Sequence, residues 1–266
     1  MSDNQQPDYD DFTRQIIQQY NEIAQLAGAL AHEIKNPLSV IRMNMDLLAE
    51  DVNHEGPINR QRVSRKVEIV QRQCERLQNL LNDFLKFARL RKLDLRPGNL
   101  NEQVDRVLDL FVVQANENGI NIQRYLDADL PSIMLDEQTL EAALVNLVKN
   151  AIEAMPDGGD LTARTRETRT GVAPDLIDTG MGMEDSTKLH MFDAFYSNKD
   201  GGSGLGLPTT QKIIESHGAT IGVLSEVGHG TQFTVEFPLP ARLPPSDNAS
   251  NPIEDNQQSL NSSGEM

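Results

Sequence analysis

Apolar residues in the first third of the chain recur at helical spacing. Between residues 12 and 50 they form one stripe at steps of three and four: Ile23, Leu26, Leu30, Ile34, Leu38, Ile41, Met45 and Leu48. Pro37 lies inside this run and predicts a kink near residues 31–33, because proline removes a backbone donor. Residues 51–59, with Gly56 and Pro57, predict a turn.

A second apolar run alternates steps of four and three, which is a heptad seam with a period of about 3.5 residues. Its members are Val63, Val67, Val70, Cys74, Leu77, Leu81, Phe84 and Ala88. The two runs predict a helical hairpin, which alone buries only one thin apolar layer. Pairing two hairpins into a four-helix bundle buries the rest, so the pattern predicts a homodimer. Cys74 on this seam is expected to be a small buried apolar residue rather than a redox switch.

Beyond a turn at residues 96–98 the pattern changes. Helices are predicted at 101–119, 137–155 and 207–217, and strands at 120–126, 132–136, 161–166, 172–178, 220–225 and 231–238. This grouping predicts an α+β two-layer sandwich with one mixed sheet under a helix layer. The expected division is a hairpin at 12–95 and a sandwich at 96–240, with disordered ends at 1–11 and 241–266.

Composition and charge exclude several classes of protein. The chain has 24 Lys and Arg against 40 Asp and Glu, a net charge of −16, which disfavours general nucleic-acid binding. Residues 60–92 are locally basic, either as a solvated helix surface or as a positive field for an acidic partner or nucleotide. The sequence contains no apolar run of about 20 residues and no leader pattern at residues 1–11. With one cysteine, these features predict a cytoplasmic protein without membrane spans.

His32 heads a chemically distinctive segment, His-Glu-Ile-Lys-Asn-Pro-Leu. It lies about 200° around the helix from Leu30 and therefore points away from the apolar stripe. Glu33 beside it is a carboxylate able to accept the ring proton, which makes His32 a candidate nucleophile, and Asn36 shares its face. A zinc-protease helix is disfavoured because Asn36 stands where the second histidine would be. An ordinary exposed histidine is the simpler alternative, although Pro37 in a long helix needs a reason.

Further polar and glycine-rich motifs follow in the predicted sandwich. Asn146 and Asn150 are four residues apart on an apolar helix, so their amides face the same way and suit phosphate oxygens or Mg²⁺ with its waters. Asp178, followed by Gly180 and Gly182, comes directly after a strand and is an acceptor for the amine of adenine. Alone, this second motif is a weak signal, and an ordinary turn at the end of a strand is the better interpretation.

The last two motifs also combine glycines with polar groups. Lys199 is followed by a loop that runs into a helix near Pro208, with the residues Gly202, Gly204, Leu205 and Gly206. Free amides at such a helix start cradle anions, and Lys199 can reach a terminal phosphate. The spacing fits neither a dinucleotide-binding fingerprint nor a P-loop. Thr231 follows the turn Gly228-His229-Gly230, which in isolation is an ordinary hairpin turn.

In combination, these motifs resemble those of sensor histidine kinases in two-component systems. The His32 segment resembles the phosphoacceptor box, and the later motifs resemble the N, G1, F, G2 and G3 boxes of the GHKL (Bergerat) ATPase domain, over about residues 12–240. The resemblance implies ATP and Mg²⁺ as cofactors and His32 as the acceptor of the γ-phosphoryl group. It implies Glu33 as proton acceptor, Asn36 as a helper in phosphate removal, Asn150 as the Mg²⁺ ligand and Asn146 as a phosphate or Mg²⁺-water contact.

The resemblance also implies partners, and other functions stay open beside it. The expected partners are a second copy of the chain and the receiver domain of a response regulator. No sensor domain is visible before the first helix, which leaves a separate sensor protein as one source of input. The chain departs from the family pattern at Pro174, which is expected to bend the sheet edge, and at Asn198 and Ala219. The alternatives are a GHKL ATPase clamp without autophosphorylation, and a non-catalytic or phosphatase-biased dimeric adaptor.

Overall fold

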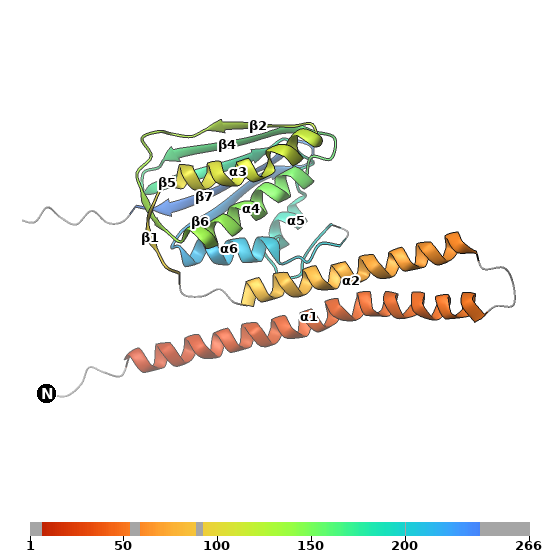
Figure 1. Cartoon of the computed structure of the whole chain (residues 1–266). Coiled ribbons are helices and arrows are strands. Elements are labelled where there is room, and N and C mark those ends of the chain that lie inside the picture. Colours follow the sequence, from red (N-terminus) through yellow and green to blue (C-terminus); the bar gives the residue numbers. More distant parts are fainter. Residues whose placement is uncertain (1–6, 54–58, 89–92, 200, 240–266) are drawn as a thin grey trace, which may run out of the picture.

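The protein combines a long helical hairpin with a layered α/β unit (Figure 1). The computed structural model describes residues 7–53, 59–88, 93–199 and 201–239, with side chains in the first helix described from Leu26 onward. The hairpin consists of α1 (Pro7–Asn53) and α2 (Arg60–Ala88), which pack against each other along their length. None of the helices in these ranges is long and apolar enough to cross a membrane.

The hairpin differs from the sequence prediction at both ends of α1. α1 begins at Pro7, so residues 7–11, expected to be disordered, are helical, while residues 1–6 lie outside the described ranges. α1 also extends to Asn53, into the predicted turn, of which residues 54–58 are not described. The helix continues past Pro37 as one element, so the kink predicted near residues 31–33 does not interrupt it. Packing against α2 stabilises the helix around the buried proline ring.

Polar groups fix the register of the hairpin on its inner face. Lys66 is buried, and its Nζ donates to the backbone oxygen of Leu47 at 2.9 Å and to Asp51 Oδ2 at 2.6 Å. Asn44 is also buried and donates to the backbone oxygen of Val40. A buried ammonium needs these partners, so sliding one helix past the other would leave a charge unpaired.

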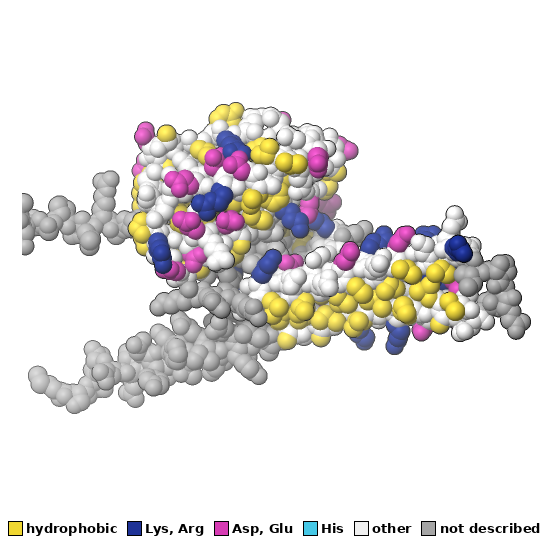
Figure 2. Space-filling view, in the orientation of Figure 1, with side chains coloured by type: hydrophobic (Ala, Val, Ile, Leu, Met, Phe, Trp, Pro, Cys, Tyr) yellow, Lys and Arg dark blue, Asp and Glu magenta, His cyan; other side chains and the backbone are white. Residues whose placement is uncertain are grey.

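The predicted apolar stripes are only partly covered within the single hairpin, and several of their side chains lie on its outer face. Leu38 and Met45 of α1 are about half exposed, as are Val67 and Leu81 of α2. Figure 2 shows the resulting band of hydrophobic side chains along the hairpin. Cys74 is exposed in the single chain, so its predicted burial is wrong for this state. The periodicity identified the apolar face correctly but not which element covers it.

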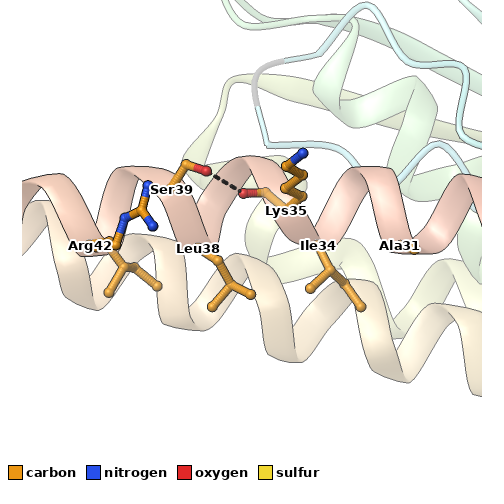
Figure 3. Close-up of a pocket in the computed structure, with 7 residues that line it drawn as sticks. Ala31, Ile34, Lys35, Leu38, Ser39 and Arg42 are labelled. Atoms are coloured by element: carbon orange, nitrogen blue, oxygen red, sulfur yellow. Dashed lines mark hydrogen bonds between the residues drawn. The ribbon is translucent and has the colours of Figure 1, made fainter.

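A shallow groove of about 550 Å³ opens on this outer face of α1. It is lined by Ala31, Ile34, Lys35, Leu38, Ser39, Ile41 and Arg42. In Figure 3, Ile34 and Leu38 point to one side of α1, and Lys35 and Ser39 to the other. The groove is therefore apolar on the side of Ile34 and Leu38 and polar on the side of Lys35 and Ser39. It begins next to His32 in the sequence of α1.

The α/β unit contains a five-stranded mixed sheet in the order β2-β4-β5-β7-β6. Its strands are β2 (Ile120–Tyr125), β4 (Gly159–Glu167), β5 (Gly171–Asp178), β6 (Thr220–Glu226) and β7 (Gly230–Pro238). β2 and β4 are parallel, and the other neighbours are antiparallel. Residues 96–98, predicted as a turn, instead form β1 (Arg96–Gly98), which pairs with β3 (Ile133–Leu135).

Helices cover one face of this sheet (Figure 1). They are α3 (Leu100–Glu117), α4 (Glu137–Glu153) and α6 (Gly206–Ser216), and the short α5 (Asp185–His190) was not predicted. Asn99 caps α3 through a bond from the Asn101 amide, and Asp136 caps α4 through a bond from the Thr139 amide. The alternating apolar residues of the strands meet the helix stripes in a single core, which confirms the predicted two-layer sandwich.

Pro174 does not lie at the sheet edge, contrary to expectation. β5 is the middle strand of the five, and Pro174 pairs with Thr165 of β4. On the other side, the ladder with β7 includes Val172 and Asp175 but not the two residues between them. Because proline has no N–H, the sheet tolerates it by a local gap in the ladder. The strand resumes pairing before Asp178, which therefore keeps its place at the strand end.

Candidate phosphoacceptor and nucleotide site

His32 lies on the solvent-exposed surface of α1, with 75% of its side chain accessible. Its Nδ1 atom is 4.0 Å from Glu33 Oε1, and Glu33 Oε2 is 3.9 Å from an Arg76 nitrogen on α2. Asn36, one turn further on, is also exposed. The carboxylate thus faces Nδ1 and is held between the two helices, which leaves Nε2 of the imidazole open to an incoming electrophile.

The two asparagines of α4 contact residues on either side of the glycine-rich loop. Asn146 Nδ2 donates to Thr210 Oγ1 of α6 at 2.9 Å. Lys199 Nζ donates to Asn150 Oδ1 at 2.9 Å and forms a short ion pair with Glu153. Both amides are partly rather than fully buried. Oxygen atoms from α4 and a cation from the loop therefore converge at one place.

Asp178 is buried at the end of β5, with 4% of the residue exposed. Its Oδ1 accepts from the backbone amides of Gly180 at 2.9 Å and Thr231 at 3.2 Å. Neither bond occupies the second carboxylate oxygen, Oδ2. Burial raises the pKa of Asp178, and the two amides offset only part of that shift. Thr231 thus positions Asp178 through its amide, and its hydroxyl bonds to Ser225 at 2.9 Å.

Close packing explains the glycines around these polar groups. A Cβ on Gly206 would stand 2.5 Å from Asn146 Oδ1, so only glycine lets α6 begin against that amide. Side chains on Gly180, Gly182 or Gly230 would strike the backbone oxygens of Ala154, Glu226 and Asp178 respectively. Glycine at these positions allows the turns to close around Asp178.

The loop between α5 and α6 is pinned at its base. The Phe195 amide donates to the Gly204 oxygen at 3.0 Å, and both residues have positive φ, 68° and 66°. Positive φ strains a non-glycine residue such as Phe195 and often marks a functional loop. Gly202 lies against Ser197 within the loop. Leu205 is buried and begins α6 without a side-chain capping bond, so it contributes backbone rather than side chain to the helix start.

This glycine-rich loop also contacts the hairpin. Ser203 Oγ donates to Asp83 Oδ2 of α2 at 2.7 Å, and Lys212 Nζ of α6 lies 4.6 Å from the centre of the Phe87 ring. The sequence pattern did not indicate these contacts, which join residues more than 100 positions apart. It also missed Glu153, although its position three residues after Asn150 places it on the same helix face.

Comparison with known families identifies both parts of the chain. Residues 22–93 match the family described as "His Kinase A (phospho-acceptor) domain". Residues 135–241 match the family described as "Histidine kinase-, DNA gyrase B-, and HSP90-like ATPase". The chain therefore belongs to the sensor histidine kinases, with a phosphoacceptor hairpin followed by an ATPase domain.

Curated relatives agree with this assignment. The chain is 30% identical over 218 residues to sporulation kinase E of Bacillus subtilis (strain 168), covering 82% of this chain and 29% of that protein. It is 30% identical over 217 residues to the sensor histidine kinase ZraS of Escherichia coli (strain K12), covering 82% of this chain and 46% of that one. The chain thus spans less than half the length of these relatives.

Solved structures match the fold of the chain in whole or in part. Full-length ShkA in complex with AMPPNP matches with a TM-score of 0.58 at 29% identity, covering 81% of this chain and 45% of that one. The catalytic domain of histidine kinase ThkA matches with a TM-score of 0.51 at 30% identity, covering 55% and 96%. ThkA in complex with the response regulator TrrA matches in fold, with a TM-score of 0.68 at 23% identity over 89% and 68% of the chains.

Proposed function

We propose that this protein transfers the γ-phosphoryl group of ATP to His32 and then to an aspartate of a response regulator. The phosphotransfer hairpin is placed at residues 12–95 and the ATP-binding domain at 96–240. The observation that carries the proposal is the contact of the glycine-rich loop with the hairpin, made by Ser203 and Asp83. It joins the nucleotide-binding half to the helix pair whose exposed His32 takes the phosphate.

The residues support an in-line transfer. Nε2 of His32 attacks the γ-phosphorus, the bond from that phosphorus to the bridging oxygen breaks, and ADP leaves. The proton on Nδ1 passes toward Glu33, which lies on that side of the ring. Phosphoryl transfer depends mainly on positioning and charge neutralisation, which the loop and the start of α6 provide. Asn36, exposed on the next turn, then assists removal of the phosphate.

The oxygen atoms of α4 fit Mg²⁺, which neutralises phosphate charge when bound. Asn150 Oδ1 accepts a hydrogen bond from the Lys199 ammonium group, and Asn146 lies one helical turn before Asn150. In the described part of the chain, no three His, Cys, Asp or Glu side chains form a metal cluster. This donor set suits Mg²⁺ bound by few protein ligands together with nucleotide phosphates. Asp178, Gly180 and Gly182 take the adenine, and Lys199, Leu205 and residues 202–206 take the phosphates.

Partners and location follow from the same surfaces. The phosphoryl acceptor is a receiver domain docked on the basic hairpin, and the complex that the kinase ThkA forms with the response regulator TrrA supports this kind of partner. The net charge of −16 argues against nucleic acid as a partner. A cytoplasmic location and input from a separate sensor protein remain predictions from the sequence.

A radiolabelling experiment tests the proposed function. The full chain is incubated with Mg²⁺ and ATP labelled at the γ-phosphate, and the label on the protein is tested in acid and alkali. A phosphohistidine is labile in acid and stable in alkali. An ATPase clamp would release phosphate without labelling the protein. A non-catalytic adaptor would do neither and would show no change in melting temperature with nucleotide.

The exposed apolar band predicts that two hairpins associate into a four-helix bundle. Leu81→Glu places a charge on this band and should convert the dimer to a monomer, because the carboxylate would be buried at the interface without a partner. Analytical ultracentrifugation measures the change. Asn79→Glu is the matched control, since this exposed residue adds the same charge to the same helix about 200° around it from Leu81, away from the apolar seam. A Leu81→Glu protein that stays dimeric would contradict this interface.

Nucleotide affinity should fall as the pH drops toward the raised pKa of Asp178. Only the ionised carboxylate accepts through both oxygens, and burial makes it take up a proton above the usual range of about 4. Ionised Asp178 therefore costs stability at neutral pH, a cost that protonation relieves as the pH falls. Titrating nucleotide from about pH 7 down to about pH 4, the range in which a carboxyl group with a raised pKa takes up its proton, measures the effect. Asp178→Asn should lose this part of the pH dependence, and an unchanged profile would refute it.

A further inference from the structure

Lys199 places a positive charge among the oxygens of α4. Its Nζ atom donates to Asn150 Oδ1 at 2.9 Å and pairs with Glu153 Oε2. Asn150 and Glu153 stand three residues apart on one face of the helix, whereas Lys199 comes from the loop that leads toward α6. An amide oxygen and a carboxylate oxygen thus bind one ammonium group together.

This arrangement matches what a small divalent cation requires. Mg²⁺ takes oxygen ligands, commonly one or two carboxylates together with phosphates and waters. A lysine ammonium is a compact point charge that can occupy the same oxygens, but it cannot share them with the metal. The pair is accessible, with 46% of the Lys199 side chain and 37% of the Glu153 side chain exposed. Exposed ion pairs are weak and exchange readily.

We propose that Lys199 is an internal cation that occupies the Mg²⁺ ligands of the nucleotide-free protein, and that Glu153 is the second protein oxygen for the metal. The inference rests on the proposed function and adds a competition to it. When Mg²⁺ and nucleotide bind, Lys199 leaves Asn150 and Glu153 and turns to the phosphates. The site then keeps a positive charge in both states, so Glu153 is never left unpaired beside the phosphates.

Substitution of a neighbouring lysine, Lys149, can distinguish competition for the metal ligands from a general effect of positive charge near Glu153. Lys149 Nζ lies 3.7 Å from the other carboxylate oxygen of Glu153, one turn away on the exposed side of α4. Lys149→Met therefore removes a positive charge near Glu153 without freeing Asn150. Lys199→Met removes the charge that bridges both oxygens. If only the local field mattered, the two substitutions would act alike.

The decisive measurement is the Mg²⁺ concentration that gives half-maximal binding of a non-hydrolysable ATP analogue to the full chain, by calorimetry. Lys199→Met should lower this midpoint by about threefold to fivefold, the ratio equivalent to one exposed ion pair. Glu153→Gln should raise it, since a metal ligand is weakened. Lys149→Met should shift it less than Lys199→Met does. A Lys199→Met midpoint that is unchanged or higher would overturn the proposal, as would an equal effect of Lys149→Met.

A second measurement needs no nucleotide. Millimolar Mg²⁺ alone should raise the melting temperature of Lys199→Met, in which Lys199 no longer occupies Asn150 Oδ1 and Glu153 Oε2, and should leave the wild type unchanged. An equal response of both proteins would also overturn the competition. If no form of the protein binds nucleotide, the proposed function fails, whereas these melting curves still decide whether Lys199 excludes the metal.

Discussion

His32→Gln is expected to abolish phosphoryl labelling of the protein while leaving nucleotide affinity unchanged. Glutamine keeps a polar side chain of similar reach but has no nitrogen that can act as a nucleophile at neutral pH. The imidazole is exposed on α1, so its replacement disturbs no core packing. Labelling with γ-labelled ATP measures the first outcome, and calorimetric titration of nucleotide measures the second.

His229→Gln is the matched control for this substitution. His229 is as exposed as His32, with 73% of its side chain accessible against 75%, and it also lies beside a glutamate, Glu226. It stands on the β6–β7 turn rather than on the hairpin. The control should keep the acid-labile label. Persistent label on the His32→Gln protein, or loss of label from the His229→Gln protein, would show that the phosphate is accepted elsewhere.

The sequence predicted the α/β unit better than the hairpin, and the reason is physical. In the sandwich, each apolar stripe has one possible destination, the core between sheet and helices, so periodicity places residues such as Leu147 and Leu161 directly. A hairpin helix packs against its partner in the chain and, in the proposed dimer, also against a second copy. The same spacing is expected for the face toward the other helix and for the face toward a second copy. It therefore identified Cys74 and Leu81 as seam residues but did not show which surface covers them.

The candidate site shows the same division between local and distant relations. The helical spacing of Asn146 and Asn150 predicted that both amides share a face, and Asn146 lies against the start of α6. The contact of Lys199 with Asn150 spans 49 positions and depends on how the loop folds back. The spacing of apolar residues along the chain does not predict how this loop folds back onto α4. For Pro174, the sequence predicted that the ladder would lose a donor. It did not predict the strand order that places this residue in the middle strand of the sheet.

Two buried aspartates on β5 now allow adenine recognition to be separated from stability. Asp178 is joined only to backbone amides of its surrounding turns in the bonds described, whereas Asp175 accepts from Thr234 Oγ1 at 2.6 Å and from Arg164 and Arg166. Burial alone would raise the pKa of Asp175, but the bonds from these three side chains outweigh it and lower that pKa. The ionised form of Asp175 is thus held by the fold itself.

Asp178→Asn is therefore expected to weaken nucleotide binding by about 10-fold to 150-fold, the loss that corresponds to one hydrogen bond with a charged group. Its structural bonds to Gly180 and Thr231 can still be accepted by the amide oxygen, and the buried charge is removed, so stability at neutral pH should not fall. Calorimetry with nucleotide and thermal melting measure the two quantities.

Asp175→Asn, three residues earlier, should do the opposite, since its side chain serves the sheet and not the site. It should lower the free energy of unfolding by about 1–3 kcal/mol and leave nucleotide affinity within a factor of about two. Because the pKa of Asp175 is lowered, its stabilising effect is present above the carboxyl pKa of the unfolded chain and is lost as the pH falls through the folded value. The wild type should therefore lose part of its advantage over Asp175→Asn in acid. If instead Asp175→Asn weakens nucleotide binding as much as Asp178→Asn, the adenine contact cannot be assigned to Asp178, and both substitutions act by disturbing β5.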